Sequence, residues 1–81
     1  MGEKEKIYKM LESIKPEHDF ASSHDYLADG YLDSMDIVML NGMIEENFKI
    51  KIDAMDILPE NYTNVESLLA LVEKSRKGDE R

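Results

Sequence analysis

Three stretches of the chain place apolar residues on one side of a helix, and the first and last of them have the i, i+3, i+4 and i+7 spacing of an amphipathic helix. The first covers residues 3–15 and ends before Pro16, which cannot continue a helix. The last follows residue 63. The apolar positions of these two stretches are Ile7, Met10, Leu11 and Ile14, and Val65, Leu68, Leu69 and Val72. Each stretch is predicted to form a helix with one face buried in a core.

The middle stretch begins at Ser34, whose hydroxyl is expected to cap the amides of a first helical turn, and runs to about Phe48. At about 100° per residue, one narrow face of this helix points to the core. That face consists of Ile37, Leu40, Ile44 and Phe48. The opposite side carries Met35, Val38, Met39, Gly42 and Glu46. A purely structural helix would place mostly charged residues there, so this second patch is expected to have a function.

The connections are irregular. Residues 16–33 show no period but contain Phe20, Tyr26, Leu27, Tyr31 and Leu32. Leaving all of these in water would be unfavourable, so a long loop fastened to the core is predicted, and such loops are often functional. Residues 53–62 are predicted to hold one short helical turn.

The last helix has a candidate start and end. The segment Thr63-Asn64-Val65-Glu66 has the pattern of a capping box, and three basic residues, Lys74, Arg76 and Lys77, suit the C-terminal end of the helix dipole. Residues 78–81 are expected to form a frayed tail.

No segment alternates like a useful strand, and the chain has no internal repeat. The sequence therefore predicts one all-α domain over residues 1–81, with an ordered core over about 3–76. The expected architecture is a small four-helix bundle, made of three main helices and a short third helix.

Composition limits the function. Eighty-one residues leave little room for a large catalytic cavity, and the absence of cysteine excludes a disulfide, a thiolate metal site and a cysteine nucleophile. This composition fits a cytoplasmic protein. The net charge of -8 disfavours nucleic acid and anionic membranes and favours partner proteins with basic surfaces. No stretch approaches the roughly 18 apolar residues of a membrane span, and no export signal is expected.

One motif suggests chemistry. Asp33-Ser34 before a helix is by itself a common start signal, but it belongs to a longer pattern. That pattern comprises Gly30, Leu32-Asp33-Ser34-Met35-Asp36, Val38, Leu40, Ile44-Glu45-Glu46, Phe48, Ile50-Lys51-Ile52, Pro59-Glu60-Asn61-Tyr62, Val65 and Leu68. It resembles the acyl carrier protein family over about residues 5–75. The Pro59–Tyr62 segment looks more like stand-alone, peptidyl or D-alanyl carrier proteins than like the housekeeping fatty-acid carrier.

The resemblance implies that Ser34 receives 4′-phosphopantetheine from coenzyme A. It further implies a partner-recognition surface made of Asp33, Met35, Asp36, Val38, Met39, Gly42, Glu45 and Glu46. The family often has a glutamate at the position of Met39 and an apolar residue at the position of Gly42. This chain departs from the usual pattern at both positions.

The same resemblance implies a carrier that is not itself an enzyme and works as a monomer. Its partners would be a magnesium-dependent phosphopantetheinyl transferase, an enzyme that loads acyl or aminoacyl groups, and downstream synthases or transferases with basic surfaces. Fatty-acid, polyketide or nonribosomal peptide biosynthesis is the expected setting. The cargo would lie in solvent or between the second and third helices, against Leu40, Ile44, Ile57 and Leu58.

The charges expected around Ser34 are compatible with an attached phosphodiester. A phosphodiester on Ser34 would sit at a helix N-terminus, where unpaired amides and the helix dipole favour negative charge. Asp33 and Asp36 repel a phosphate, so the group is expected to point outward into solvent.

Two other classes of function compete. Residues 25–36 match an EF-hand calcium loop at the first, fifth, sixth, eighth and ninth positions and have an acid at the twelfth, but Leu27 stands where the third ligand belongs. A hydrolase would need Ser34 activated by His18 or His24, yet the chain lacks a nucleophile elbow and a recognisable oxyanion loop. Both histidines are expected to be loop residues exposed to water.

Overall fold

The computed structural model describes residues 2–79. Its helices are α1 (Glu3–Ile14), α2 (Ser34–Phe48) and α3 (Val65–Asp79), joined by the short 3-10 helices η1 (Phe20–Ser22), η2 (Ala54–Asp56) and η3 (Pro59–Tyr62). No strand occurs within residues 2–79, so the predicted all-α bundle is confirmed. The short third helix is two 3-10 turns, η2 and η3, instead of one.

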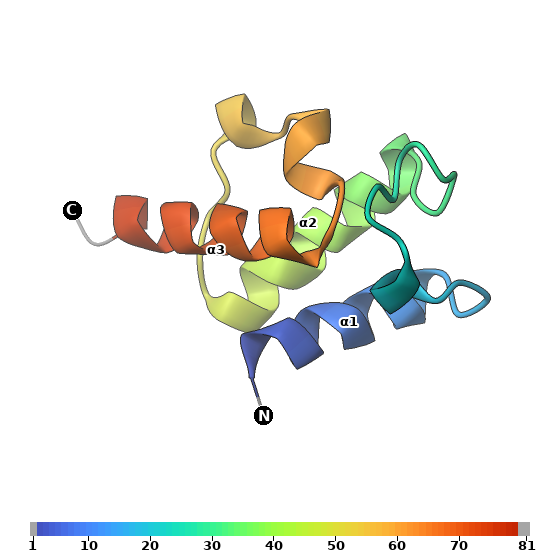
Figure 1. Cartoon of the computed structure of the whole chain (residues 1–81). Coiled ribbons are helices and arrows are strands. Elements are labelled where there is room, and N and C mark those ends of the chain that lie inside the picture. Colours follow the sequence, from blue (N-terminus) through green and yellow to red (C-terminus); the bar gives the residue numbers. More distant parts are fainter. Residues whose placement is uncertain (1, 80–81) are drawn as a thin grey trace.

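The helices α1 and α2 pack together and run in opposite directions, and α3 packs against α1 and η3 (Figure 1). At one end of the pair, Lys15 Nζ lies 3.6 Å from Asp36 Oδ2. At the other end, Lys6 Nζ lies 5.8 Å from the centre of the Phe48 ring. These two polar contacts lie at opposite ends of the helix pair, on either side of its buried core residues.

A single core takes side chains from the three helices and from the connections. Its largest fully buried members are Tyr26, Tyr62, Phe20, Ile7, Leu11, Leu40, Ile44, Leu68 and Val72. Fully burying one large apolar side chain contributes about 1.5–3 kcal/mol, so this set supplies the main stabilisation of a small domain. Each helix that the sequence pattern predicted contributes one face to it.

The long loop between α1 and α2 is fastened to the core, as predicted. Phe20 and Tyr26 meet edge to face with ring centres 5.0 Å apart. The Tyr26 amide donates to the carbonyl of Thr63 over 2.7 Å, which ties the loop to the start of α3. Asn64 Nδ2 adds a bond of 3.2 Å to the His24 carbonyl.

The capping box of α3 lies one residue later than predicted. Asn64 Oδ1 accepts from the Ser67 amide over 2.8 Å, and Ser67 Oγ accepts from the Asn64 amide over 3.2 Å. Thr63 has helical backbone angles because it ends the η3 turn, so it cannot be the cap. Glu66, the expected partner of Thr63, forms an ion pair with Lys4 instead.

The structure describes only part of the C-terminal segment that was predicted to be a frayed tail, residues 78–81. The α3 backbone is helical to Asp79, whereas residues 80–81 lie outside the described residues. No helix within residues 2–79 is long and apolar enough to cross a membrane.

Two buried tyrosines differ in one respect that stability measurements can test. The Tyr62 hydroxyl donates to Asn41 Oδ1 over 2.7 Å, whereas the buried Tyr26 hydroxyl lies near the Val65 backbone but forms no hydrogen bond of good geometry within residues 2–79. We expect Tyr62→Phe to lower the free energy of unfolding by about 1 kcal/mol, because Asn41 loses its partner. Tyr26→Phe should leave it unchanged or higher. Urea unfolding of both variants checks this, and a larger loss for Tyr26→Phe would contradict it.

Candidate functional site

The N-terminus of α2 is held by Asp33, not by Ser34, so the predicted serine cap is wrong. Asp33 Oδ1 accepts from the Asp36 amide over 2.9 Å, and Asp36 Oδ2 accepts from the Asp33 amide over 3.1 Å. The extended backbone of Asp33 suits the cap position, whereas Ser34 is already the first helical residue. The Ser34 hydroxyl therefore takes no part in the cap, and the residue is exposed.

Asp36 is buried, with only 4% of its surface exposed. Its carboxylate closes the capping box and also faces Lys15 at the end of α1. Although Asp36 was expected to contact partners, it presents little surface to them. Its observed role is to fix the start of α2 against α1, and thereby to fix the position of Ser34.

A cleft, here called the serine cleft, opens beside Ser34. Its volume is about 270 Å³, and it is lined by Ser34, Ile37, Val38, Ile57, Leu58, Pro59 and Tyr62. Of the four residues predicted to contact a cargo, Ile57 and Leu58 line this cleft, whereas Leu40 and Ile44 are completely buried in the core. The cleft is therefore shallower than the sequence suggested.

The far wall of the serine cleft is held in place by polar contacts. Lys74 Nζ lies 2.6 Å from Asp56 Oδ1, which ties η2 to α3. Asn61 Nδ2 donates to the Asp56 carbonyl over 2.6 Å. The hydrogen bond between the Lys74 ammonium and the Asp56 carboxylate also raises the pKa of Lys74 above its usual value. These contacts join η2 to α3 and to η3, while the Tyr62 hydroxyl joins η3 to Asn41 of α2.

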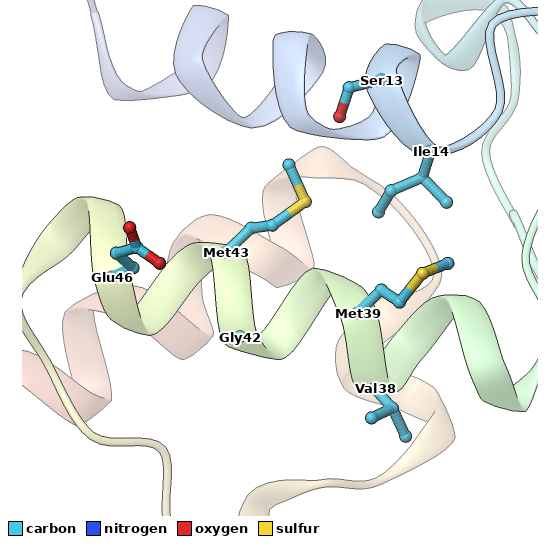
Figure 2. Close-up of a pocket in the computed structure, with 7 residues that line it drawn as sticks. All are labelled: Ser13, Ile14, Val38, Met39, Gly42, Met43 and Glu46. Carbon is cyan, nitrogen blue, oxygen red and sulfur yellow. The ribbon is translucent and has the colours of Figure 1, made fainter.

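The second patch predicted on α2 is exposed. The exposed fractions are 75% for Met35, 71% for Val38 and 50% for Met39. Gly42 and Glu46 lie farther along the same helix, where they line a second hollow, here called the α1–α2 groove (Figure 2). The surface between Ser34 and Glu46 is thus largely apolar and unburied.

Glu45 and Glu46, predicted as one acidic surface, differ. Glu45 Oε2 accepts from the Ile52 amide over 2.8 Å, and the Glu45 carbonyl accepts from the amides of Lys49 and Ile50. Lys49 has a left-handed backbone (φ 56°), which ends the helix. Glu45 thus holds the chain reversal after α2, while the Glu46 side chain is exposed.

The calcium loop is not assembled. The Asp25 carboxylate accepts from the Ala28 amide, and that of Asp29 accepts from the Ser23 hydroxyl over 2.6 Å. No group of three or more possible metal ligands comes together within residues 2–79. Gly30 has a φ of 75°, so its place in the motif is explained by a left-handed turn.

Neither histidine is placed as a base for Ser34. His18 is half-buried instead of fully exposed, because its ring stacks on Tyr31 with centres 4.2 Å apart. His24 is exposed, and its carbonyl receives Asn64. Within residues 2–79 no hydrogen bond joins either ring to Ser34.

Two features of the site escaped the sequence analysis. Lys15 forms an ion pair with Asp36, and Asn41 accepts a hydrogen bond from the hydroxyl of Tyr62, a residue that lines the serine cleft. Spacing rules predict contacts only between residues close together in the sequence, so these two contacts become visible only once the packing of the helices is known.

The site is an exposed serine on a capped helix start, beside a small apolar cleft, in a bundle of helices. Comparison with known proteins gives a match to the family model described as phosphopantetheine attachment site, over residues 6–72. The chain belongs to this family, whose members carry covalently attached 4′-phosphopantetheine and are not catalytic themselves. No curated protein and no solved structure matches the chain significantly.

The capping carboxylate gives a pH prediction. The hydrogen bond from the Asp36 amide holds the pKa of Asp33 below its usual value. A carboxyl group whose pKa is lower in the folded protein than in the unfolded chain stabilises the fold at pH values above its pKa in the unfolded chain. This stabilisation is lost as the pH falls through the pKa that the group has in the folded protein. Asn also caps helices but does not ionise. We expect Asp33→Asn to lose less thermal stability than the parent between about pH 6 and pH 3. An equal loss, measured by circular dichroism, would contradict this.

Gly42 allows a second stability test. A Cβ atom at Gly42 would meet nothing within 4 Å, and glycine inside a helix costs about 1 kcal/mol relative to alanine. We therefore expect Gly42→Ala to raise the melting temperature by about 4–8 °C. Gly30→Ala is the control, because the positive φ of Gly30 should make the same change destabilising. A lower melting temperature for Gly42→Ala would show that the glycine is required for folding.

Proposed function

We propose that Ser34 is the attachment residue for 4′-phosphopantetheine and that the chain is an acyl carrier protein. It would shuttle acyl or aminoacyl intermediates between the enzymes of fatty-acid, polyketide or a related biosynthesis. The single observation that carries the proposal is the exposed Ser34, the first residue of α2, with its hydroxyl outside the capping box. The family match over most of the chain supports it.

The residues around Ser34 fit the group. Its phosphodiester would lie at the N-terminus of α2, where amides and the helix dipole favour negative charge. The carboxylate of Asp33 repels the phosphate and directs it away from the helix cap. When attached, the group supplies a terminal thiol on which acyl groups are held as thioesters.

Attachment needs a separate enzyme. The Ser34 hydroxyl oxygen forms the new bond to the phosphorus that bears the pantetheine arm in coenzyme A. The bond from that phosphorus to the adenosine bisphosphate part breaks, and the serine proton passes to a base of a magnesium-dependent transferase. The chain's own part is to hold the hydroxyl outward, since neither histidine lies against it.

Partner recognition is proposed for the exposed side of α2. Met35, Val38 and Met39 provide flexible apolar contacts, and flexible methionines suit a surface that must accept several enzymes. The net charge of -8 would steer basic surfaces toward it. The proposed partners are the transferase, a loading enzyme and downstream synthases, met by a cytoplasmic monomer. The serine cleft would shelter only the part of the cargo nearest the arm.

The test is intact-protein mass spectrometry after incubation with coenzyme A, magnesium and a broad-specificity phosphopantetheinyl transferase. We expect the parent chain to gain one phosphopantetheine, because its hydroxyl is exposed, and Ser34→Ala to gain none. Ser22→Ala is the matched control, since Ser22 is also exposed but lies in η1, and it should be modified like the parent. No gain by the parent with several transferases would refute the proposal, as would a gain by Ser34→Ala.

A further inference from the structure

Lys15 connects the end of α1 to the start of α2. Its Nζ lies 3.6 Å from Asp36 Oδ2, and the Lys15 side chain is partly buried while that of Asp36 is almost fully buried. Asp36 closes the capping box that begins at Asp33, and Ser34 lies between these two residues. The Lys15 ammonium is therefore a positive charge placed against the turn that holds the candidate attachment residue.

The backbone keeps Lys15 at this place. The Lys15 amide donates to the Leu11 carbonyl over 2.9 Å, and the Lys15 carbonyl accepts from the His18 amide over 3.3 Å. Pro16 disfavours helical backbone angles at the residue before it, in agreement with the φ of -135° and ψ of 79° of Lys15. The last turn of α1 holds no basic residue, so the Lys15 ammonium is the cation beside the negative end of that helix dipole.

Lys15 also changes the charge around Ser34. Two carboxylates, those of Asp33 and Asp36, meet one ammonium group at the first turn of α2. The hydrogen bond from the Asp36 amide lowers the pKa of Asp33 most, and the charge of Lys15 lowers this pKa further. Without Lys15, a phosphate arriving at Ser34 would meet two uncompensated negative charges, which oppose the attraction by the helix amides and dipole.

The burial of Asp36 makes the lysine important for geometry as well. A buried carboxylate that loses its cation turns toward water, because an unpaired buried charge is costly. The hydrogen bond of 3.1 Å that Asp36 Oδ2 accepts from the Asp33 amide would then be lost. The start of α2 would fray, and the Ser34 hydroxyl would lose its fixed position.

We infer that Lys15 is a positioning residue for the attachment of phosphopantetheine: by pairing with Asp36 it keeps the first turn of α2 closed around Ser34 and reduces the negative charge that the incoming phosphate meets. The inference rests on the proposed function, which it deepens by naming a residue on another helix that sets the rate of attachment. Lys15 acts through Asp36 and takes no part in the bonds that form or break.

The first experiment measures the rate of phosphopantetheine transfer to the full chain by intact-protein mass spectrometry. Coenzyme A and magnesium are saturating and the chain concentration is varied, which separates kcat from KM. Lys15→Met removes the charge and keeps a long side chain, whereas Lys15→Arg keeps the charge. Lys9→Met is the matched control, because it removes the same charge from an exposed position on the same helix.

We expect Lys15→Met to lower kcat about tenfold, because a misplaced reacting group slows the chemical step. Its KM for the chain should equal that of Lys9→Met, since both variants have the same net charge and are steered equally to a basic enzyme surface. Lys9→Met should keep the kcat of the parent, and Lys15→Arg should stay within about twofold of it. Equal kcat values for Lys15→Met and Lys9→Met, or no rescue by Lys15→Arg, would overturn the inference.

A double-variant cycle tests the route through Asp36, and it remains decisive if Lys15→Met alone folds poorly. In Asp36→Asn the side-chain oxygen can still accept from the Asp33 amide but carries no charge, so it needs no cation. If Lys15 acts through Asp36, adding Lys15→Met to Asp36→Asn should leave kcat at the value of Asp36→Asn alone. A further loss of about tenfold in this background would show that Lys15 acts elsewhere, contrary to the inference.

Amide hydrogen exchange of the unmodified ¹⁵N-labelled chain reads the capping box without any enzyme. The amides of Asp33 and Asp36 donate within the box, so they should exchange about threefold faster or more in Lys15→Met than in Lys9→Met. The amide of the core residue Val72 should exchange equally in both variants. Exchange at Asp33 and Asp36 that is unchanged, or that rises only together with that of Val72, would contradict a role in positioning.

The two proposals fail in different ways. If the parent chain itself is not modified by any transferase, the proposed function is refuted, and the inference about attachment falls with it. If the parent is modified and Lys15→Met is modified at the same rate, only the inference about Lys15 is refuted.

Discussion

The start of α2 is the constraint on which the site depends. Asp33 and Asp36 close the first turn reciprocally, and Lys15 at the end of α1 faces the buried Asp36 carboxylate. A buried carboxylate without such partners would be costly, so the end of α1 and the start of α2 stabilise each other. As a result, the amides and the dipole at the start of α2 point outward, and the Ser34 hydroxyl is not used in the helix cap.

The same helix has three distinct flanks. Leu40 and Ile44 are completely buried, the flank toward η2 and η3 borders the serine cleft, and the flank toward α1 borders the α1–α2 groove. The core therefore carries the stability, while the other two flanks keep exposed apolar surface that a lone structural helix would not retain.

Much of the fold could be predicted from the sequence. Apolar spacing located all three helices because each buries one face, and the large apolar residues of the long loop were correctly expected in the core. The cap of α2 was misplaced because Asp33 and Ser34 are both good cap residues, and only backbone angles decide between them. The Asp36 burial, the Glu45 bond to Ile52 and the groove follow from how the helices pack, which local spacing does not encode.

The most direct test of the account is an amide correlation spectrum of the ¹⁵N-labelled chain before and after phosphopantetheine transfer. If the arm is carried outward by a fixed helix start, changes should be confined to the first turn of α2 and the lining of the serine cleft, such as Ile57 and Leu58. The amides of core residues such as Ile7, Leu11 and Val72 should not move. Shifts throughout the core, or a modification that leaves the first turn of α2 unaffected, would contradict the account.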